Sequence, residues 1–243
     1  MRVRACFLAF MPACVLMGAT AEAKSAHDYL DDLGDYALAP LHWDAADWTR
    51  AGEAAVAIGA AYSADNRVRD HFVDGGVPAG QDPHAWRDAA PMLALAAGTF
   101  AIGKLHHDAA TASIGADMAE AGALGLLSST ALKFAAGRER PNETSSRSSW
   151  HEGGDGFPSG HVTAAFAVAQ VFADRMPREQ WGWRVLAYGL AGATAYARLD
   201  SNVHWMSDVV AGAALGLSTG RFVSGRAAAG PAGRVTLGVQ PLD

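Results

Sequence analysis

The sequence has almost no cysteine. Cys6 and Cys14 are the only two, and both lie within the first 14 of the 243 residues. The rest of the chain therefore has no thiol that could form a disulfide, act as a nucleophile or bind zinc. Without disulfides, stability must come from packing, and a chain of this length can bury a substantial core.

Basic residues are also scarce. The chain has 19 Lys and Arg against 25 Asp and Glu, a formal net charge of -6, and no stretch concentrates the basic residues. A protein that binds nucleic acid presents clustered Lys and Arg side chains to the phosphates. We therefore expect no nucleic-acid partner.

Long hydrophobic runs are missing, although half of the residues are hydrophobic. Six apolar blocks rich in alanine and glycine have uncharged windows of 9 to 15 residues: 54–62, 89–103, 121–132, 162–173, 185–197 and 209–220. A helix that spans a bilayer needs about 20 apolar residues. The pattern predicts an all-α fold, a single helical-bundle domain of about six core helices packed closely through small residues. Membrane association is the alternative.

The N-terminus has the features of a secretory signal. Arg2 and Arg4 precede an apolar run, which ends in Ala21-Glu22-Ala23, a small-residue cleavage pattern. We expect residues 1–23 to be a signal peptide and residues 24–243 to be the functional domain, exported to the periplasm or secreted. The alternative is that the segment stays as an anchor in the envelope membrane.

A first pattern of cations flanks the start of a long polar loop, residues 138–157. Lys133 lies at the end of a predicted helix, Gly137 is a plausible C-cap, and Arg140-Pro141 follows in the loop. Loops of this length in a compact domain are more often functional than idle. Basic residues near a helix C-terminus also simply complement its dipole, so this pattern alone favours a structural role.

A second pattern, Pro158-Ser159-Gly160-His161, stands directly before the apolar block 162–173. A helix that begins here would present free N–H groups of Ser159, Gly160 and His161, and glycine would let an anion approach closely. This would be an oxyanion site with an imidazole attached. For a generic Ser-Gly pair, an ordinary N-cap formed by Ser159 is the better interpretation.

A third pattern comprises Arg198, His204 and Asp208. On a helix, His204 and Asp208 share a face, so the carboxylate can accept the imidazole N–H and leave the other nitrogen free as a nucleophile. A cap within residues 200–202 would place His204 in the first turns of that helix, where the dipole disfavours the imidazolium ion. A satisfied core His–Asp pair is the structural alternative.

Together the three patterns identify a family. Lys133-x6-Arg140-Pro141, Pro158-Ser159-Gly160-His161 and Arg198-x5-His204-x3-Asp208 resemble the type 2 phosphatidic acid phosphatase (PAP2) superfamily. The superfamily includes class A non-specific acid phosphatases, lipid phosphatases and vanadium haloperoxidases. The resemblance covers residues 133–208. The three motifs are specific for the superfamily, but they do not distinguish its member families from one another. Ala197 stands where the family usually has a serine, so this chain lacks a hydroxyl that would help to hold Arg198 or the phosphate, which bears on substrate and rate more than on reaction type.

The resemblance implies a role for each residue. His204 would attack phosphorus and become a phosphohistidine, Asp208 would orient it, and His161 would act as general acid and then as general base. The phosphate oxygens would be bound by Lys133, Arg140, Ser159, Gly160 and Arg198. Cations and a helix N-terminus can neutralise a phosphoryl group in place of a metal, so no cofactor and no metal are expected. The adjacent His106, His107 and Asp108 do not share a helix face, which disfavours a metal site there.

The sequence thus predicts an exported, metal-independent phosphatase, a phosphoric monoester hydrolase. The short apolar windows favour soluble phosphomonoesters as substrates. Lipid phosphates or pyrophosphates are the second possibility, because Trp150, Trp181 and Trp183 lie near predicted loops, where tryptophan can sit at a bilayer surface. A vanadium-dependent haloperoxidase is a third reading, since vanadate resembles the phosphoryl transition state. A helical envelope protein with a decayed site is disfavoured by the intact motifs.

Overall fold

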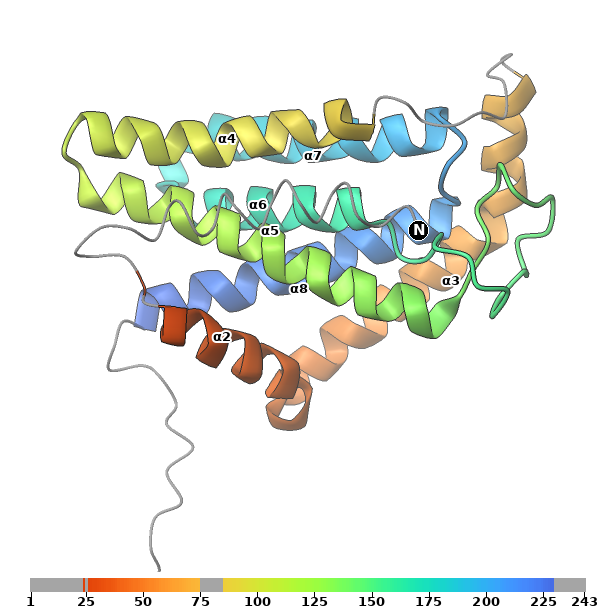
Figure 1. The fold of residues 1–243 in the computed structure, drawn as a ribbon, viewed down its shortest axis with the longest axis horizontal. Coiled ribbons are helices and arrows are strands. Elements are labelled where there is room, and N and C mark those ends of the chain that lie inside the picture. Colours follow the sequence, from red (N-terminus) through yellow and green to blue (C-terminus); the bar gives the residue numbers. More distant parts are fainter. Residues whose placement is uncertain (1–23, 25, 75–84, 230–243) are drawn as a thin grey trace, which may run out of the picture.

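The structure is a computed structural model that describes Lys24 and residues 26–74 and 85–229 (Figure 1). Within these residues it has two short 3-10 helices, Ala39–His42 and Arg178–Gln180, no strand, and seven α-helices. The α-helices are α2 (Ala26–Leu38), α3 (Ala45–Asp74), α4 (Ala85–Leu105), α5 (Ala109–Ala136), α6 (Gly160–Arg175), α7 (Trp181–Asp200) and α8 (Met206–Ala229). The prediction of an all-α bundle is confirmed.

The six predicted apolar blocks lie in α3 to α8, and each observed helix extends beyond its block. Helix α2 was not predicted because four aspartates interrupt its apolar positions. The predicted signal peptide, residues 1–23, lies outside the described residues. Within the described part of the chain, no helix is both long enough and apolar enough to cross a membrane.

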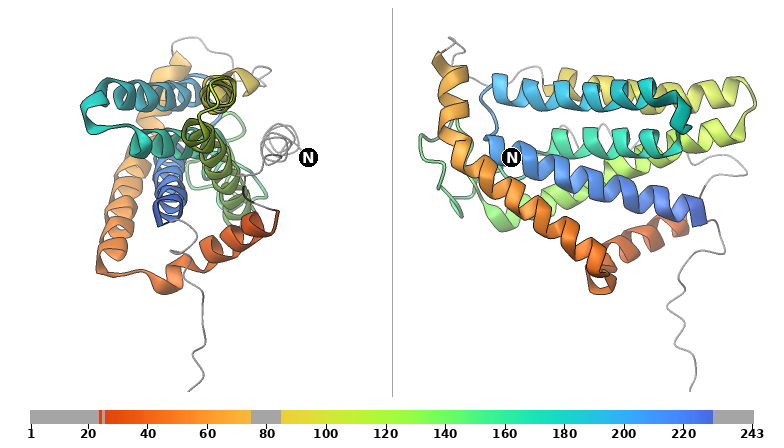
Figure 2. Two further views of the ribbon diagram at one scale, coloured as in Figure 1. Left: turned by 90° about the vertical axis from the view of Figure 1, so that its left-hand side faces the viewer. Right: turned by 180° about the vertical axis from the view of Figure 1, so that it is seen from behind.

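Helix α6 occupies the middle of the bundle. It packs against α5, α7 and α8, which surround it in the views of Figure 2. Val162, Val168 and Val171 of α6 are completely buried, and Met118 of α5 packs in the same core. The N-terminus of α6 is thereby held at one end of a rigid core.

Helix α8 approaches α6 through a row of glycines. A Cβ atom on Gly212 would lie 2.7 Å from the carbonyl oxygen of Ser159, and one on Gly216 would overlap the carbonyl oxygen of Thr163. Gly220 repeats the contact one turn later, 2.5 Å from the Cβ of Gln170. The predicted packing through small residues is confirmed here, and it brings the first turns of α8 and α6 together.

Candidate active site

The predicted site residues come from five parts of the fold, and the structure brings them to one end of the bundle. Lys133 ends α5, Arg140 follows in the loop, and residues 159–161 begin α6. Arg198 lies in the last turn of α7, whereas His204 and Asp208 flank the start of α8. Four basic side chains lie close enough to His204 to affect its imidazole electrostatically: Arg140, Lys133, Arg198 and His161.

Asp155 connects the two cations of the first pattern. Gly137 ends α5 with a left-handed φ of 54°, which turns the chain into the loop. Nε and Nη2 of Arg140 then donate to the Asp155 carboxylate at 2.6 and 2.9 Å, and Lys133 Nζ donates to the Asp155 carbonyl oxygen. Burial alone would raise the pKa of Asp155, but Arg140 and Lys133 hold it below its usual value. Both cations therefore point into the loop. A role limited to compensating the dipole at the C-terminus of α5 would not require this arrangement.

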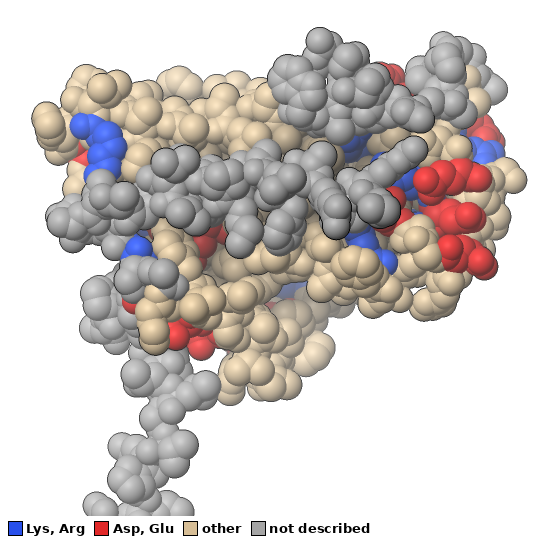
Figure 3. Space-filling view, viewed as in Figure 1, with Lys and Arg blue, Asp and Glu red and all other residues tan. Residues whose placement is uncertain are grey.

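The loop itself has an acidic outer rim. Acidic side chains gather at this end of the molecule in Figure 3, and Glu143 and Glu152 of the loop are exposed. The cations Lys133 and Arg140 lie further in and are partly buried. At this end of the molecule, acidic side chains are therefore more exposed than the two cations.

Ser159 begins α6 without capping it. Its side chain makes no capping hydrogen bond, and its fully buried Oγ has no hydrogen-bond partner within the described residues. The ordinary N-cap interpretation is therefore wrong. The expected free N–H of Ser159 is also corrected, because it donates to the Asp208 carbonyl oxygen at 3.0 Å. The amides of Gly160 and His161 remain at the helix N-terminus, where no intrahelical acceptor exists.

Gly160 is enclosed by the end of α5. A Cβ atom there would lie 3.2 Å from Leu126 Cδ1 and from Ser129 Oγ, and 3.9 Å from Lys133 Cε. A side chain at this position would press on α5. Because Gly160 has no side chain, the N-terminus of α6 and the Lys133 side chain can lie next to each other.

His204 precedes α8, which corrects the prediction that it lies within the helix. Helix α7 ends at Asp200, Asn202 adopts a φ of 52°, and α8 begins only at Met206. Nδ1 of His204 nevertheless lies 3.6 Å from Oδ2 of Asp208, an oxygen that accepts the N–H of Trp205 at 2.8 Å. The two side chains are thus adjacent where the chain enters the helix, but 3.6 Å is too long for the predicted hydrogen bond, and Nδ1 has no hydrogen-bond partner among the described residues.

The environment keeps the His204 imidazole neutral. Burial lowers its pKa well below the usual value, and the nearby cations lower it further. The sequence predicts a neutral imidazole because of the dipole of its own helix. In the structure, the pKa of His204 is lowered instead by burial and by four neighbouring side chains: Arg140, Lys133, Arg198 and His161. Burial also raises the pKa of Asp208 to about 6, against the opposing charge of Arg138. Near neutral pH the pair is a neutral imidazole beside a carboxylate.

A buried histidine beside a carboxylate and among cations is the arrangement that the sequence patterns predict. The PAP2 superfamily model matches residues 115–227. This segment is therefore similar to the PAP2 superfamily, as the sequence patterns predict. The chain is also 38% identical over 91 residues to the lipid A 1-phosphatase of Porphyromonas gingivalis. That match covers 37% of this chain and only 18% of the relative, and no solved structure matches significantly.

In the cluster of His106, His107 and Asp108, the aspartate has a structural role. Asp108 caps α5 by accepting the N–H groups of Ala110 and Thr111 at 3.0 and 3.2 Å. In residues 24, 26–74 and 85–229, no group of three or more His, Cys, Asp or Glu side chains is placed to hold a metal ion.

Sequence reasoning missed three residues that contact the site. Asp155 has no distinguishing signal within a polar loop, although its glycine neighbours mark a tight turn. Arg138 lies two positions from Arg140, and nothing in the local sequence separates the two arginines. Asp65 of α3 lies outside the matched PAP2 segment, and only the tertiary structure brings it to Arg138.

Proposed function

We propose that the protein is a metal-independent phosphatase that hydrolyses phosphate esters through a phosphohistidine on His204. The observation that carries this proposal is the buried imidazole of His204, whose pKa is lowered by burial and by three basic side chains, beside the N-terminus of α6. A nucleophile needs an available lone pair, and a dianionic substrate needs positive charge around it. The similarity of residues 115–227 to the PAP2 superfamily supports the same reaction.

The phosphate group would be held by groups that are already in place. Lys133, Arg140 and Arg198 supply positive charge, and the first amides of α6 supply oriented donors. The buried Ser159 hydroxyl supplies one more donor. These groups stabilise the equatorial oxygens as charge redistributes in the transition state, which is the part a metal plays in other phosphatases.

The reaction then proceeds in two displacements. Nε2 of His204 attacks phosphorus while its Nδ1–H donates to Asp208, and the P–O bond to the leaving group breaks. His161 gives a proton to the departing oxygen, which leaves as an alcohol. His161 next takes a proton from water, whose oxygen attacks phosphorus, and inorganic phosphate and free His204 result.

The location and substrate complete the proposal. The signal-like residues 1–23 support export to the periplasm or secretion. Soluble phosphomonoesters are the first candidate substrates. Lipid phosphates are the second, supported by the name of the Porphyromonas gingivalis relative and by the exposed apolar side chains of α7. These α7 side chains are Trp181, Trp183, Val185, Leu186 and Tyr196.

The experiment uses the full chain with an aryl phosphate and a dispersed phosphatidic acid as alternative substrates, each with EDTA. Hydrolysis should survive EDTA and should be blocked by vanadate, which adopts the five-coordinate geometry of the transition state. Rapid quenching without acid should trap phosphate on His204, and His204→Ala should abolish this labelling. Loss of activity on chelation that zinc or magnesium restores would contradict the mechanism. Bromide oxidation by peroxide with added vanadate would favour a haloperoxidase.

A further inference from the structure

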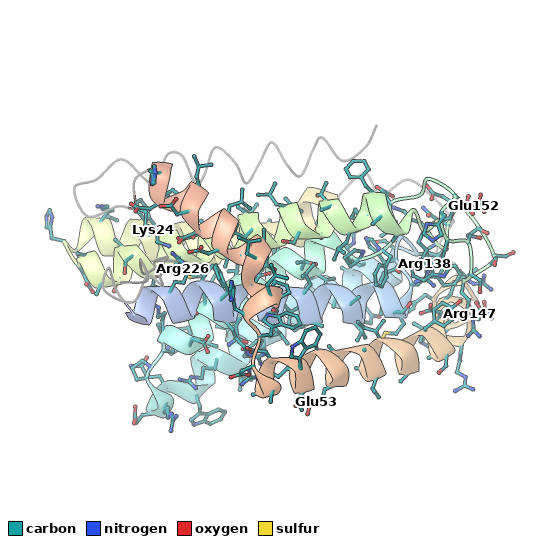
Figure 4. The ribbon with its side chains drawn as sticks, turned by 90° about the horizontal axis from the view of Figure 1, so that it is seen from below. Lys24, Glu53, Arg138, Arg147, Glu152 and Arg226 are labelled. Carbon is teal, nitrogen blue, oxygen red and sulfur yellow. The ribbon has the colours of Figure 1, made fainter. Side chains whose placement is uncertain are left out.

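A fully buried polar network joins Asp208 to helix α3. It consists of Asp65 of α3, Arg138 of the loop, and Ser207 and Asp208 of α8. The side chains of Asp65, Arg138 and Asp208 are all completely buried. Figure 4 shows Arg138 at the same end of the molecule as Arg147, far from Lys24 and Arg226.

All five N–H donors of Arg138 have acceptors. Nη1 donates to Asp208 Oδ1 at 2.5 Å and to Ser207 Oγ at 2.7 Å. Nη2 donates to Asp65 Oδ2 at 2.7 Å and to the Arg147 carbonyl oxygen at 2.8 Å. Nε donates to the same carbonyl at 3.2 Å. A guanidinium with every donor used has one orientation, and it fixes the carboxylate that it grips.

Three aromatic rings enclose this guanidinium. Its central carbon lies 4.5 Å from the ring centre of Trp150, 5.3 Å from that of Tyr62 and 5.4 Å from that of Trp205. Aromatic faces attract a cation and keep water away from it. In this low-dielectric site, the contact between Arg138 and Asp208 is stronger than it would be in water.

Asp65 attaches the network to the first turn of α8. Its Oδ1 accepts the Ser207 N–H at 2.8 Å, and its Oδ2 accepts the Ser207 hydroxyl at 2.7 Å. Ser207 immediately precedes Asp208. Asp65 therefore holds both the backbone beside Asp208 and the guanidinium that binds its carboxylate.

One guanidinium thus lies between two buried carboxylates. Burial disfavours an ionised Asp208, and Arg138 opposes that effect. Asp65 pairs with Arg138 on its other side. The negative charge of Asp65 raises the pKa of Asp208, so the contribution of Asp65 is to hold the guanidinium and the Ser207 backbone in place. Polar groups buried this deeply are costly unless all of them are paired, and a purely structural element could be apolar instead.

We propose that Asp65 and Arg138 are positioning residues, which hold the Asp208 carboxylate in the orientation that faces Nδ1 of His204. The proton of the neutral imidazole then stays on Nδ1, and Nε2 keeps its lone pair for attack. The expected loss of kcat in variants of these residues rests on the proposed function. The position of the proton on the imidazole does not rest on it, because the tautomer is a property of the resting protein.

The test compares the full-length wild type with Asp65→Asn, using Asp47→Asn as the matched control. Asp47 lies on the same helix, but its side chain is partly exposed and contacts Arg50 and the backbone N–H of Asp44, which precedes the helix. Histidine-selective 15N NMR reads which ring nitrogen of His204 carries the proton, with His204→Ala identifying the signal. We expect the Nδ1–H tautomer in the wild type and in Asp47→Asn, and a mixture of tautomers in Asp65→Asn. We also expect kcat to fall at least about tenfold in Asp65→Asn with little change in KM.

A second variant, Arg138→Lys, keeps the positive charge and loses the five-donor fork. It should give the same mixture of tautomers and a similar loss in kcat, and it decides the question if Asp65→Asn does not fold. An Nδ1–H tautomer that persists in the folded variant overturns the positioning role, whatever the activity. An unchanged kcat in an active enzyme does the same. A wild type without phosphatase activity would contradict the proposed function, and the NMR result would still decide the positioning role.

Discussion

His161 and His204 have different surroundings, which suit the two different roles proposed for them. His204 is buried among cations, which hold its pKa down and keep a lone pair available. His161 is only partly buried and occupies the first turn of α6, so it can reach a leaving group and exchange protons with water. The proposed nucleophile and the proposed acid are therefore separable by experiment.

The His161→Ala variant should discriminate between leaving groups. Protonation matters most when the departing oxygen is a basic alkoxide, and little when it is a stabilised phenolate. We expect a loss of about 10²- to 10⁴-fold in kcat/KM on an alkyl phosphate and a much smaller loss on an activated aryl phosphate. A phosphoenzyme should accumulate with the aryl substrate, because His161 is also the proposed base. Equal losses on both substrates, without an accumulated intermediate, would limit His161 to binding.

The pH profile should report the environment of the His204–Asp208 pair. The pKa of His204 lies below that of a free imidazole, and the pKa of Asp208 is about 6. Protonation of either group removes the lone pair or its orienting acceptor, so activity is lost only as the pH falls below about 6. We expect the acid limb of kcat/KM, corrected for the separately measured titration of the substrate, to lie below pH 6.5. A limb above that value would indicate a solvated imidazole.

At the scale of the elements, the α6–α8 contact determines where the site forms. The backbone carbonyl oxygens of Ser159 and Thr163 lie directly against the glycines of α8. This close approach places Asp208 where its carbonyl oxygen accepts the Ser159 N–H. A wider spacing would separate the proposed nucleophile from the phosphate-binding helix N-terminus.

The Gly216→Ala variant should therefore destabilise the fold. Its Cβ atom would overlap the Thr163 carbonyl oxygen, and backbone atoms cannot rotate away, so we expect a loss of about 1–3 kcal/mol. Gly189→Ala is the matched control, because nothing lies within 4 Å of a Cβ on that α7 residue. Alanine is the better helix former, so this control should be neutral or stabilising by up to about 1 kcal/mol. Urea unfolding measures both changes, and equal effects would contradict the close packing.

At the scale of the whole molecule, a second set of buried charges lies at the opposite end from Arg138. Lys24 and Arg226, labelled in Figure 4, hold α2 against the bundle. Lys24 pairs with Asp32 of α2 at 2.8 Å and with Glu120 of α5 at 2.6 Å. These ion pairs include none of the proposed catalytic groups, so we expect them to affect the stability of the protein and not its reaction.

Glu120 should make the stability of the protein depend on pH. Burial raises its pKa to about 7 although Lys24 opposes the rise, whereas the unfolded chain releases this proton near 4.5. The folded state therefore binds the proton more tightly, and the free energy of unfolding should fall as the pH rises from about 4.5 to about 7.

The Glu120→Gln variant should remove this contribution. Relative to wild type, its free energy of unfolding should rise between pH 4.5 and pH 7, by on the order of 2 kcal/mol. Glu53→Gln, an exposed change on α3, should leave the pH dependence unaltered. Thermal or urea unfolding across this pH range provides the measurement. Parallel curves for wild type and Glu120→Gln would contradict the raised pKa.

Much of the site could be read from the sequence because the necessary signals are local. Gly137 marks the end of α5, and glycine tolerates the left-handed conformation found there. Fixed spacings within short segments also linked Lys133 to Arg140 and His204 to Asp208. The helix boundary at Met206 was mispredicted, because polar residues after Asp200 can equally well cap a helix or continue a connecting loop.

The sequence by itself determined the all-α class, the small-residue packing and the residue types of the proposed chemistry, since each follows from periodicity or from short-range spacing. Only the tertiary structure decided which groups support that chemistry. Asp65 reaches Arg138 across 73 positions of sequence, and Asp155 is distinguished from other loop residues only by its contact with Arg140. Burial and pairing depend on what the folded chain places around a residue, and neither is a property of the residue's immediate neighbours in sequence.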